Sequence, residues 1–439
     1  MNVIQIVCDS TRVDFLGLNG GWVKTPNIDR LAGESCVFDF AMSESLPTIP
    51  VRRALSTTRR TFPYKDGPRP KGINNSRFGW RPIPEEHVTV AEHLQGQGYT
   101  TGMVIDTYHM MKPAMNFHRF FDSFQWIRGQ EFDQYKTGRF DYDILKRYTN
   151  LEIDKANPRL RVLIKYLRNQ QGRETEEEYQ SGQVFGTAAQ WVEENAEEER
   201  FFLWVDSFSP HPAWYAPKKY MDLYAPDYDG LEVIFPGAVD KAKLTDAELE
   251  HMRCCYAATL SLVDANIGRL LDKIDECGLR DNTIVMLLSD HGYMLGDYDR
   301  LIGMASEFVR PEIYRIMCMM RHPDGLGAGK RVASPVYNID LVHTALETVG
   351  AGPVERSDGT DLRPLITGEQ EKVHDYLVCA QHDYQSVWDD DWVYYRNDDE
   401  EWLHDRHTDM AQERNLAKDN EAKRSEMAER LGAFLRSRE

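Results

Sequence analysis

The sequence lacks a long hydrophobic run and any excess of positive charge. No stretch of the 439 residues approaches the roughly 20 apolar residues that span a bilayer, so we expect no membrane partner. The formal net charge of -19 argues against a nucleic-acid-binding surface, because nucleic acids attract basic proteins. An anionic substrate would therefore need a local positive site, from a metal ion or from clustered arginines.

Cysteine pairs and an export signal are also missing. The 7 cysteines are an odd number without a CxxC pair, which is typical of reduced, buried thiols rather than of a disulfide framework. The chain opens on residues 2–7, a strand pattern with neither a basic start nor an apolar run long enough for export. We therefore expect a cytoplasmic protein. The sequence does not decide whether it forms a homo-oligomer.

What the sequence does contain is an alternation of buried strands and amphipathic helices. Apolar runs predict strands at 2–8, 100–105, 199–206 and 282–289. Helices are predicted between them, the longest over 244–277. This alternation predicts a doubly wound, mostly parallel α/β fold. Short strands and a charged helix follow residue 370, so we expect a catalytic domain over 1–370 and a small α+β subdomain over 371–439 that completes the active-site pocket.

A polar loop leads into a helical pattern that carries an arginine. Pro50 suits the first turn of a helix, which places Thr48 at or just before the helix N-terminus. Free backbone N–H groups and the macrodipole favour negative charge there. Arg52 lies one turn on, so its guanidinium can return toward the same anion. The alternative is that Thr48 is a simple N-cap and Arg52 a surface residue.

Other polar residues follow the ends of predicted strands, where active sites of open α/β sheets lie. Asp9 follows the first strand, and Asp290 and His291 follow the strand at 282–289. Together with Thr48 they form a plausible set of ligands for one divalent cation, Mn²⁺, Zn²⁺ or Fe²⁺ rather than Ca²⁺. Such an ion would lower the pKa of the Thr48 hydroxyl and polarise an ester oxygen. Asp9 and Asp290 each also have an alternative role as a helix cap.

Three further histidines are candidates for the site. His211, in Pro210-His211-Pro212, follows a strand end and is expected to contact the substrate or act as a general acid. His109 follows the strand at 100–105, and His382 lies where the C-terminal subdomain can fold over the site. Each could instead be a structural histidine.

These motifs resemble those of the sulfatases of the alkaline phosphatase superfamily, from residue 3 to about 416. The matching segments are Asp9 with Arg12 and Asp14, 25–32, Thr48 through Arg59, Pro210-His211-Pro212, Asp290-His291-Gly292, Leu295-Gly296-Asp297, 358–362 and 415–417. The resemblance implies an α/β/α sandwich with a mostly parallel sheet and a small C-terminal subdomain. It also implies a metal-dependent ester hydrolase.

The sequence departs from this family at the nucleophile. Sulfatases oxidise a Cys or Ser at this position to formylglycine, but position 48 is threonine. Its Cβ carries a methyl group, so the same oxidation would give a ketone. Threonine is the nucleophile in phosphate-ester-cleaving relatives. Ser10 and His291 replace a usual second aspartate and a frequent asparagine, and they make the metal site resemble phosphonate-monoester and phosphodiester hydrolases.

Two lysines that sulfatases place on the sulfate oxygens are also missing. The first falls near Asp106, with Lys112 judged too far along, and the second falls at Met304. A singly charged diester or phosphonate monoester would tolerate this loss better than a dianion. The arginines that could replace the lysines are Arg52, Arg53, Arg300 and Arg310.

The sequence therefore predicts a hydrolase of small phosphate-type esters. The expected catalytic residues are Thr48, Arg52, His211 and His109. The expected substrate-binding residues are Asp106, Tyr108, Arg300 and His382. The alternatives are a sulfate-ester hydrolase that uses unmodified threonine, a transferase to an acceptor alcohol, and a degenerate sulfatase-fold protein that only binds its ligand.

Overall fold

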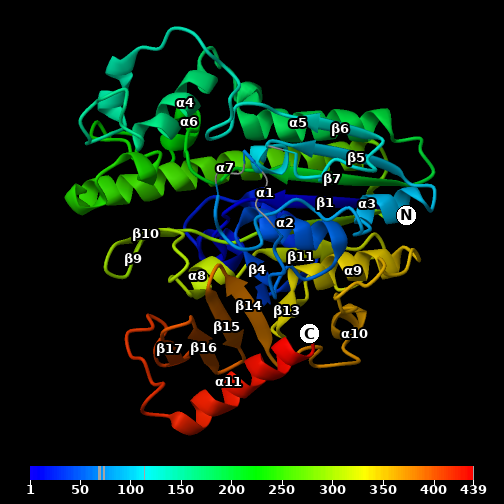
Figure 1. The fold of residues 1–439 in the computed structure, drawn as a ribbon. Coiled ribbons are helices and arrows are strands. Elements are labelled where there is room, and N and C mark those ends of the chain that lie inside the picture. The colour runs from blue at the N-terminus through cyan, green and yellow to red at the C-terminus, as the bar shows by residue number, and fades with distance from the viewer. Residues whose placement is uncertain (68–70, 73–74, 113, 439) are drawn as a thin grey trace.

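An eight-stranded sheet forms the centre of the molecule (Figure 1). The computed structural model describes residues 1–67, 71–72, 75–112 and 114–438. In spatial order the strands are β12 (Arg331–Val332), β2 (Cys36–Phe38), β11 (Cys318–Arg321), β8 (Thr283–Ser289), β1 (Asn2–Cys8), β7 (Phe201–Ser207), β5 (Thr100–Ile105) and β6 (Ser123–Trp126). The five strands from β8 to β6 are parallel, whereas β11 is antiparallel to both of its neighbours.

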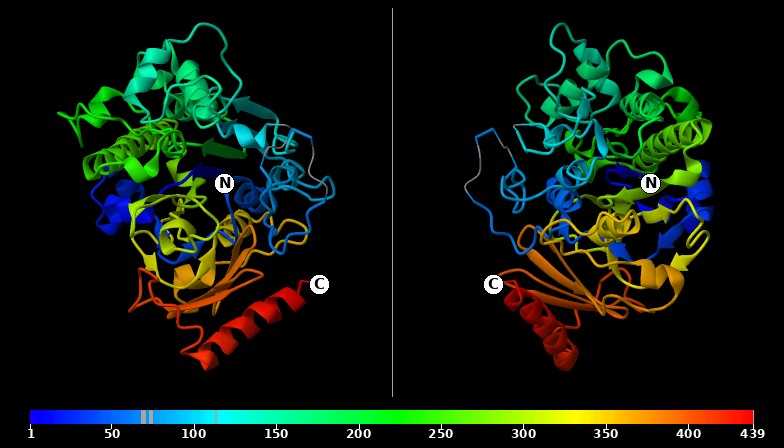
Figure 2. Two further views of the ribbon diagram at one scale, coloured as in Figure 1. Left: turned by 60° about the vertical axis from the view of Figure 1, so that its left-hand side comes forward. Right: turned by 90° about the vertical axis from the view of Figure 1, so that its right-hand side faces the viewer.

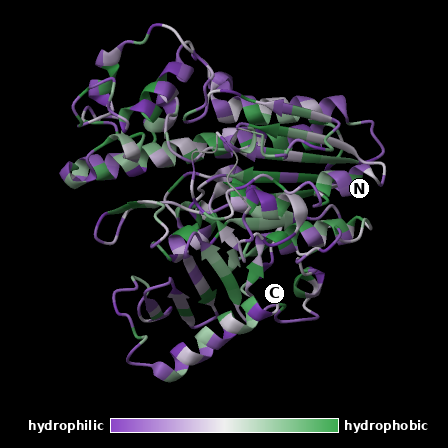
Figure 3. Cartoon of the chain, in the orientation of Figure 1, coloured by the Kyte–Doolittle hydropathy of each residue, from purple (hydrophilic) through white to green (hydrophobic). Residues whose placement is uncertain are grey.

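Helices cover both faces of this sheet (Figure 2). In β1, Ile4 and Ile6 point to one apolar core, and Val3 and Val7 point to the other. A strand buried on both faces reads as a continuous apolar run, as the sequence does here and as Figure 3 shows. The helices on the face of Ile4 are α1 (Pro26–Gly33), α4 (Leu160–Gln170), α5 (Gln180–Glu194) and α7 (Asp246–Glu276). Those on the face of Val3 are α2 (Thr48–Thr57), α3 (Val90–Gln95) and α9 (Asn338–Thr348).

A second sheet packs beside the first and consists mainly of C-terminal residues. Its strands, in order, are β17 (Glu401–Asp405), β16 (Trp392–Arg396), β15 (Tyr384–Trp388), β14 (Leu377–Gln381) and β4 (Ser45–Leu46). Helix α11 (Glu421–Arg436) packs on this sheet through Met427 and Leu431. The edge strand β4 comes from the segment that leads directly into Thr48, and it pairs in parallel with β14. Backbone hydrogen bonds thus join the C-terminal sheet to the start of α2.

The remaining elements are short. They are β3 (Ala41–Met42), β9 (Met294–Asp297), β10 (Leu301–Gly303), β13 (Val336–Tyr337), α6 (Lys218–Met221), α8 (Pro311–Tyr314) and α10 (Arg363–Thr367). All seven cysteines are free thiols, as predicted, and only Cys277 is not fully buried. No helix in the described ranges is both long and apolar enough to cross a bilayer.

The predicted α/β fold with a mostly parallel sheet is confirmed. The strands predicted at 2–8 and 100–105 have the observed bounds. The long helix predicted over 244–277 begins at Asp246, because the Thr245 side chain accepts the Glu248 N–H and the Glu248 carboxylate returns to the Thr245 N–H. The sequence did not predict the antiparallel β11 or the added strands β2 and β12. The residue 370 boundary stays a prediction.

Candidate active site

An aspartate lies at the carboxyl end of each of four neighbouring parallel strands. They are Asp9 after β1, Asp106 after β5, Asp206 as the penultimate residue of β7, and Asp290 after β8. All four side chains are fully buried. A buried carboxylate is costly unless it is paired or hydrogen-bonded, so the partners of these four residues define the site.

Arg52 is the cation that three of these carboxylates share. Its Nη1 lies 3.1 Å from Asp9 Oδ2 and 2.5 Å from Asp290 Oδ2, and its Nη2 lies 3.0 Å from Asp206 Oδ1. Burial lowers the pKa of this guanidinium, but the three carboxylates outweigh it and raise the pKa above its ordinary value. Arg52 is therefore charged and fully buried, not a surface residue.

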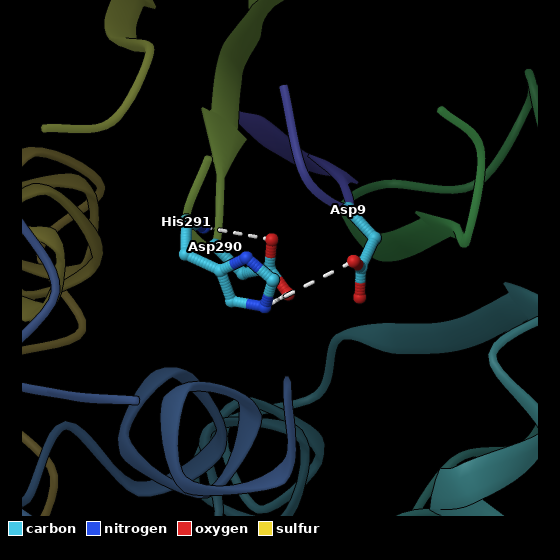
Figure 4. A group of neighbouring side chains, drawn as sticks. All are labelled: Asp9, Asp290 and His291. Carbon is cyan, nitrogen blue, oxygen red and sulfur yellow. Dashed lines mark hydrogen bonds and ion pairs between the residues drawn. The ribbon is translucent and has the colours of Figure 1, made fainter. Parts of the chain in front are cut away.

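Asp9, Asp290 and His291 bring three ligand-bearing side chains to one point (Figure 4). One ligand atom from each lies within 4.8 Å of the others, and all three residues are buried. His291 Nε2 is 3.3 Å from Asp290 Oδ2 and 4.0 Å from Asp9 Oδ1. His291 Nδ1 lies 3.0 Å from the Gly292 carbonyl oxygen, which can only accept a hydrogen bond. The proton of the neutral ring therefore sits on Nδ1, and Nε2 carries a lone pair.

This group fits a divalent cation. Within the described residues, neither Asp9 Oδ2 nor His291 Nε2 makes a hydrogen bond although both are buried, and Asp9 Oδ2 has only its ion pair with Arg52 Nη1. Three buried carboxylates and one guanidinium sum to a formal charge of -2 (three negative, one positive), which one divalent ion would balance. Burial lowers the pKa of His291 and so keeps the imidazole neutral, the form that binds metals. Mixed carboxylate and imidazole ligands suit Mn²⁺, Zn²⁺ or Fe²⁺.

Ser10 and Gly292 hold the carboxylates and the imidazole in place. Ser10 has a left-handed φ of 61°, and its N–H donates to Asp290 Oδ1 at 2.9 Å while its hydroxyl donates to Asp9 Oδ1 at 2.8 Å. Gly292 lies against α8, where a Cβ would be 1.9 Å from the Glu312 carbonyl oxygen. The glycine of the Asp-His-Gly motif is therefore required by close packing.

Arg12 joins the two loops that carry the metal-site residues. Its guanidinium pairs with Asp14 at 2.7 Å and with Asp297 at 2.9 Å. Asp14 and Asp297 belong to two motifs of the family resemblance, and in the structure they hold these loops together through Arg12. They lie outside the Asp9–Asp290–His291 group.

Thr48 is the first residue of α2, and its N-cap is Pro47. The alternative that Thr48 is the N-cap is therefore wrong. Thr48 is buried, and its backbone carbonyl accepts a hydrogen bond from Arg52 Nη1 at 3.3 Å. The nitrogen that reaches the Thr48 backbone is thus the one that contacts Asp9 and Asp290. Thr48 as a metal ligand stays a prediction.

Asp206 is a site residue that the sequence reasoning missed. It binds Arg52, and it accepts hydrogen bonds from the Thr107 hydroxyl and from the Trp204 indole N–H at 3.2 Å. The signal was present, because Asp206 ends an apolar strand in the same way that Asp9 and Asp290 follow theirs.

His211 and His109 both pack against the Phe208 ring. The ring centroids are 4.2 Å apart for His211 and 5.7 Å apart for His109. Burial lowers the pKa of His211 to about 4, so this ring is neutral near pH 7. His211 Nδ1 donates to the Pro212 carbonyl at 2.6 Å, which leaves its Nε2 as an acceptor. In this state His211 can take up a proton but cannot donate one from Nε2.

His109 is held by a carboxylate that the sequence reasoning also missed. Its Nε2 lies 3.2 Å from Glu131 Oε2, and the Tyr108 hydroxyl donates to the same oxygen at 2.9 Å. Tyr108 and His109 line a cavity of about 390 Å³ next to this pair. Glu131 lies in a loop far along the chain, so no local pattern connected it to His109.

Three of the predicted substrate-binding residues, Asp106, Arg300 and His382, bind other groups of the protein. Asp106 is fully buried, and its two oxygens accept the Phe208 N–H at 2.6 Å and the Gln130 amide at 2.7 Å, so it binds protein rather than facing the cavity. Arg300 pairs with Asp246 at 2.7 Å and does not join the site. His382 accepts the Phe78 N–H at 3.3 Å, at the contact between the C-terminal sheet and the segment that carries Arg77.

The other arginines considered as replacements for the missing lysines are engaged elsewhere. Arg53 donates to the Gly79 carbonyl at 2.7 Å, and Arg310 donates to the Ala411 carbonyl. A different arginine, Arg77, lies near the position of the second missing lysine, because its Nη2 donates to the carbonyl of Met304 at 3.0 Å. Lys112, judged too far along the chain, lines the same cavity as Arg77 and His109.

A model of the family named Sulfatase matches residues 1–351. The chain belongs to the sulfatase family. Sulfatase-family proteins are ester hydrolases, so the chain is an enzyme that acts on ester bonds. The family resemblance predicted from the motifs is thereby confirmed.

Individual relatives within the sulfatase family and its superfamily differ in the activity that their names state. An ulvan-active sulfatase of Formosa agariphila is 28% identical over 372 residues, which cover 83% of this chain and 65% of the relative. PehA of Trinickia caryophylli, a multifunctional alkaline phosphatase superfamily protein, is 24% identical over 412 residues, which cover 83% of this chain and 77% of PehA. The crystal structure of the phosphonate monoester hydrolase of Agrobacterium radiobacter has the same fold, with a TM-score of 0.77 at 19% identity over 99% of this chain and 95% of that one.

Proposed function

We propose that this sulfatase-family enzyme hydrolyses phosphate-type esters, either phosphodiesters or phosphonate and phosphate monoesters, with Thr48 as the nucleophile. The observation that carries the proposal is the threonine at the first position of α2, beside Arg52 and the Asp9–Asp290–His291 group. Threonine keeps a hydroxyl that can attack phosphorus, but it cannot become the aldehyde on which sulfatases depend. The fold shared with a phosphonate monoester hydrolase supports this choice.

The proposed reaction has two steps. The Thr48 oxygen attacks phosphorus and the bond to the alcohol oxygen breaks, which leaves a phosphorylated threonine and a free alcohol that takes up the proton lost by the Thr48 hydroxyl. Water then attacks the same phosphorus, breaks its bond to Thr48 and restores the hydroxyl. The charge of Arg52 stabilises the loop and the negative charge that develops on the transferred group.

Asp9, Asp290 and His291 would hold one divalent cation. When bound, the ion would polarise an oxygen of the ester and lower the pKa of the Thr48 hydroxyl. We assign His211 and His109 to contact with the transferred group or the departing oxygen, because both rings pack on Phe208 and His109 lines the cavity. We also propose a small anionic ester as the substrate and the cytoplasm as the location.

The test is a comparison of four substrates with protein loaded with Mn²⁺ or Zn²⁺. They are p-nitrophenyl sulfate, p-nitrophenyl phosphate, bis-p-nitrophenyl phosphate and p-nitrophenyl phenylphosphonate. We expect turnover of the diester or the phosphonate, and its loss in Thr48→Ala. Thr57→Ala, at the other end of the same helix, is the matched control and should retain activity. Full activity of Thr48→Ala would contradict the proposal.

A second candidate is a sulfate-ester hydrolase that uses unmodified threonine. The similarity to the ulvan-active sulfatase favours it. A preference for p-nitrophenyl sulfate over the three phosphorus esters would support this second function. Metal binding without turnover of any substrate would instead indicate a protein that only binds its ligand.

A further inference from the structure

We propose that the alcohol released from the substrate is a planar ring that carries a negatively charged group, and that Arg77, Lys112 and three aromatic side chains bind it. The inference rests on the proposed function, because it names the leaving group of that reaction. It is argued from the cavity of about 390 Å³ that adjoins His109.

Besides Gly72, Asn75 and Ser76, the lining of this cavity consists of cationic and aromatic side chains. Arg77 and Lys112 bring positive charge, and the aromatic rings of Trp80, Tyr108 and Phe132 form walls beside His109. No carboxylate belongs to this lining among the described residues. Arg77 and Lys112 therefore give the lining two positive charges in a chain whose net charge is -19, while the Glu131 carboxylate binds His109 and Tyr108 without belonging to the lining. This local reversal of sign selects for anions.

The two cations are not used by ion pairs within the protein. Neither Arg77 nor Lys112 lies within 4.0 Å of a carboxylate oxygen in the described part of the chain, whereas the buried Arg12, Arg52 and Arg321 all do. With the residues that the structure describes, the Arg77 guanidinium makes one hydrogen bond, from Nη2 to the Met304 carbonyl at 3.0 Å. That bond orients the group and leaves its other N–H donors available for a carboxylate, sulfonate or phosphate. Lys112 Nζ lies over the Phe132 ring at 5.6 Å, a weak contact that an anion can replace.

The walls explain why the ligand is planar. Trp80 meets His109 edge-on, with ring centroids 5.0 Å apart, and Tyr108 lies against the same imidazole at 4.0 Å. Aromatic walls with a few fixed polar groups are typical of sites that bind ring-shaped ligands. A flexible aliphatic anion would use the two cations but not the rings.

The cavity adjoins His109, which the proposed function assigns to the transferred group or the departing oxygen. His109 lines the cavity, and the Phe208 ring connects it to His211. An ester whose phosphorus lies near Thr48 and His291 can therefore place its ring between Arg77 and Lys112.

The experiment compares two leaving groups that differ by one carboxylate. Phenylphosphonate esters of 4-nitrophenol and of 5-hydroxy-2-nitrobenzoate are assayed with wild type, Arg77→Met and Lys112→Met. We expect wild type to prefer the carboxylated ester by roughly tenfold or more in kcat/KM, and each variant to lose most of that preference. Turnover of the 4-nitrophenyl ester reports on folding and on the chemical step. Arg81→Met, four residues from Arg77 and outside the cavity lining, should keep the preference.

A binding measurement separates this inference from the proposed function. Thr48→Ala protein is titrated calorimetrically with 5-hydroxy-2-nitrobenzoate and with 4-nitrophenol, without any reaction. Tighter binding of the carboxylated ring, lost in Thr48→Ala/Lys112→Met, would support the site even if no ester is turned over. Equal affinity for the two rings, or an unchanged preference in both cation variants, would overturn it whatever the activity of the enzyme.

Discussion

Arg52 and Asp206 form a fully buried ion pair, with Nη2 3.0 Å from Oδ1, on the side of the guanidinium away from Asp9 and Asp290. Two further donors, Thr107 and Trp204, hold Asp206 in place. The pair gives Arg52 an anchor that does not depend on the two aspartates at the metal site. It leaves those carboxylates able to turn toward a cation.

We predict that Asp206→Asn destabilises the protein by about 3 kcal/mol, because removing one partner of a buried ion pair leaves the other charge incompletely paired. The free energy of unfolding in urea measures this effect. Metal affinity should also fall, since Arg52 would then depend on Asp9 and Asp290 alone. Asp143→Asn, which breaks an exposed pair with Lys146, should leave the urea midpoint unchanged.

Metal binding should stabilise the folded protein through His291. At a Zn²⁺ or Mn²⁺ concentration of 100 times the dissociation constant, the expected gain is about 2.7 kcal/mol. Thermal unfolding with and without the ion measures it. His291→Ala should abolish the shift, and His407→Ala, which removes an exposed histidine, should not. An equal shift in both variants would place the ion elsewhere.

Thr48→Ser keeps the nucleophilic hydroxyl and should retain phosphate-ester turnover, whereas Thr48→Ala should not. Rapid quenching of wild type during turnover should give a peptide containing Thr48 whose mass is increased by one phosphoryl or phosphonyl group. Mass spectrometry of the digested protein checks this. Turnover without modification of that peptide, at quench times shorter than one cycle, would contradict a covalent intermediate.

The pH dependence should reflect His211. Its pKa is lowered from 6.5 to about 4 in the folded protein, mainly by burial, so the folded state disfavours the protonated ring. The stability associated with neutral His211 is therefore complete above about pH 6.5 and is lost progressively as the pH falls toward 4. Titration of the ring by NMR tests the pKa directly. In His211→Gln the acid side of the stability profile should be flatter, and a His211 pKa near 6.5 would contradict this account.

Gly292→Ala should destabilise the protein by about 2 kcal/mol, because its Cβ would collide with the Glu312 carbonyl and force the backbone to move. The same movement would turn His291 away from Asp9 and lower metal affinity. Gly33→Ala is the control, since a Cβ there meets nothing within 4 Å. Its stability should be unchanged or slightly higher.

The sequence predicted what depends on local pattern. The parallel strands could be predicted because strands buried on both faces are continuously apolar, and Asp9 and Asp290 stood out as the polar residues that end them. Asp206 carried the same signal, because it ends the strand predicted at 199–206. His211, which follows that strand, was the predicted site residue instead. The strands β2 and β12, at one end of the sheet, are short, so their apolar pattern is too brief to distinguish from a loop.

The residues that the sequence did not predict come together only through tertiary contacts. Arg77 reaches Met304 across more than two hundred residues, and Glu131 reaches His109 from a separate loop. Lys112 was excluded by its position in the motif, although a short turn after Tyr108 brings it back to the cavity. Arg300 was included for its charge alone, but Asp246 at the start of α7 binds it.

The pairing of β4 with β14 also sets an order of events during synthesis of the chain. The ribosome produces Ser45 and Leu46 early, but their partners Ala380 and Gln381 emerge only after more than three hundred further residues. Until β14 has been synthesised, the segment that leads into Thr48 lacks the strand with which it pairs. The last strand of the large sheet to be synthesised is β12, so that sheet can form before the segment that leads into Thr48 gains its partner strand.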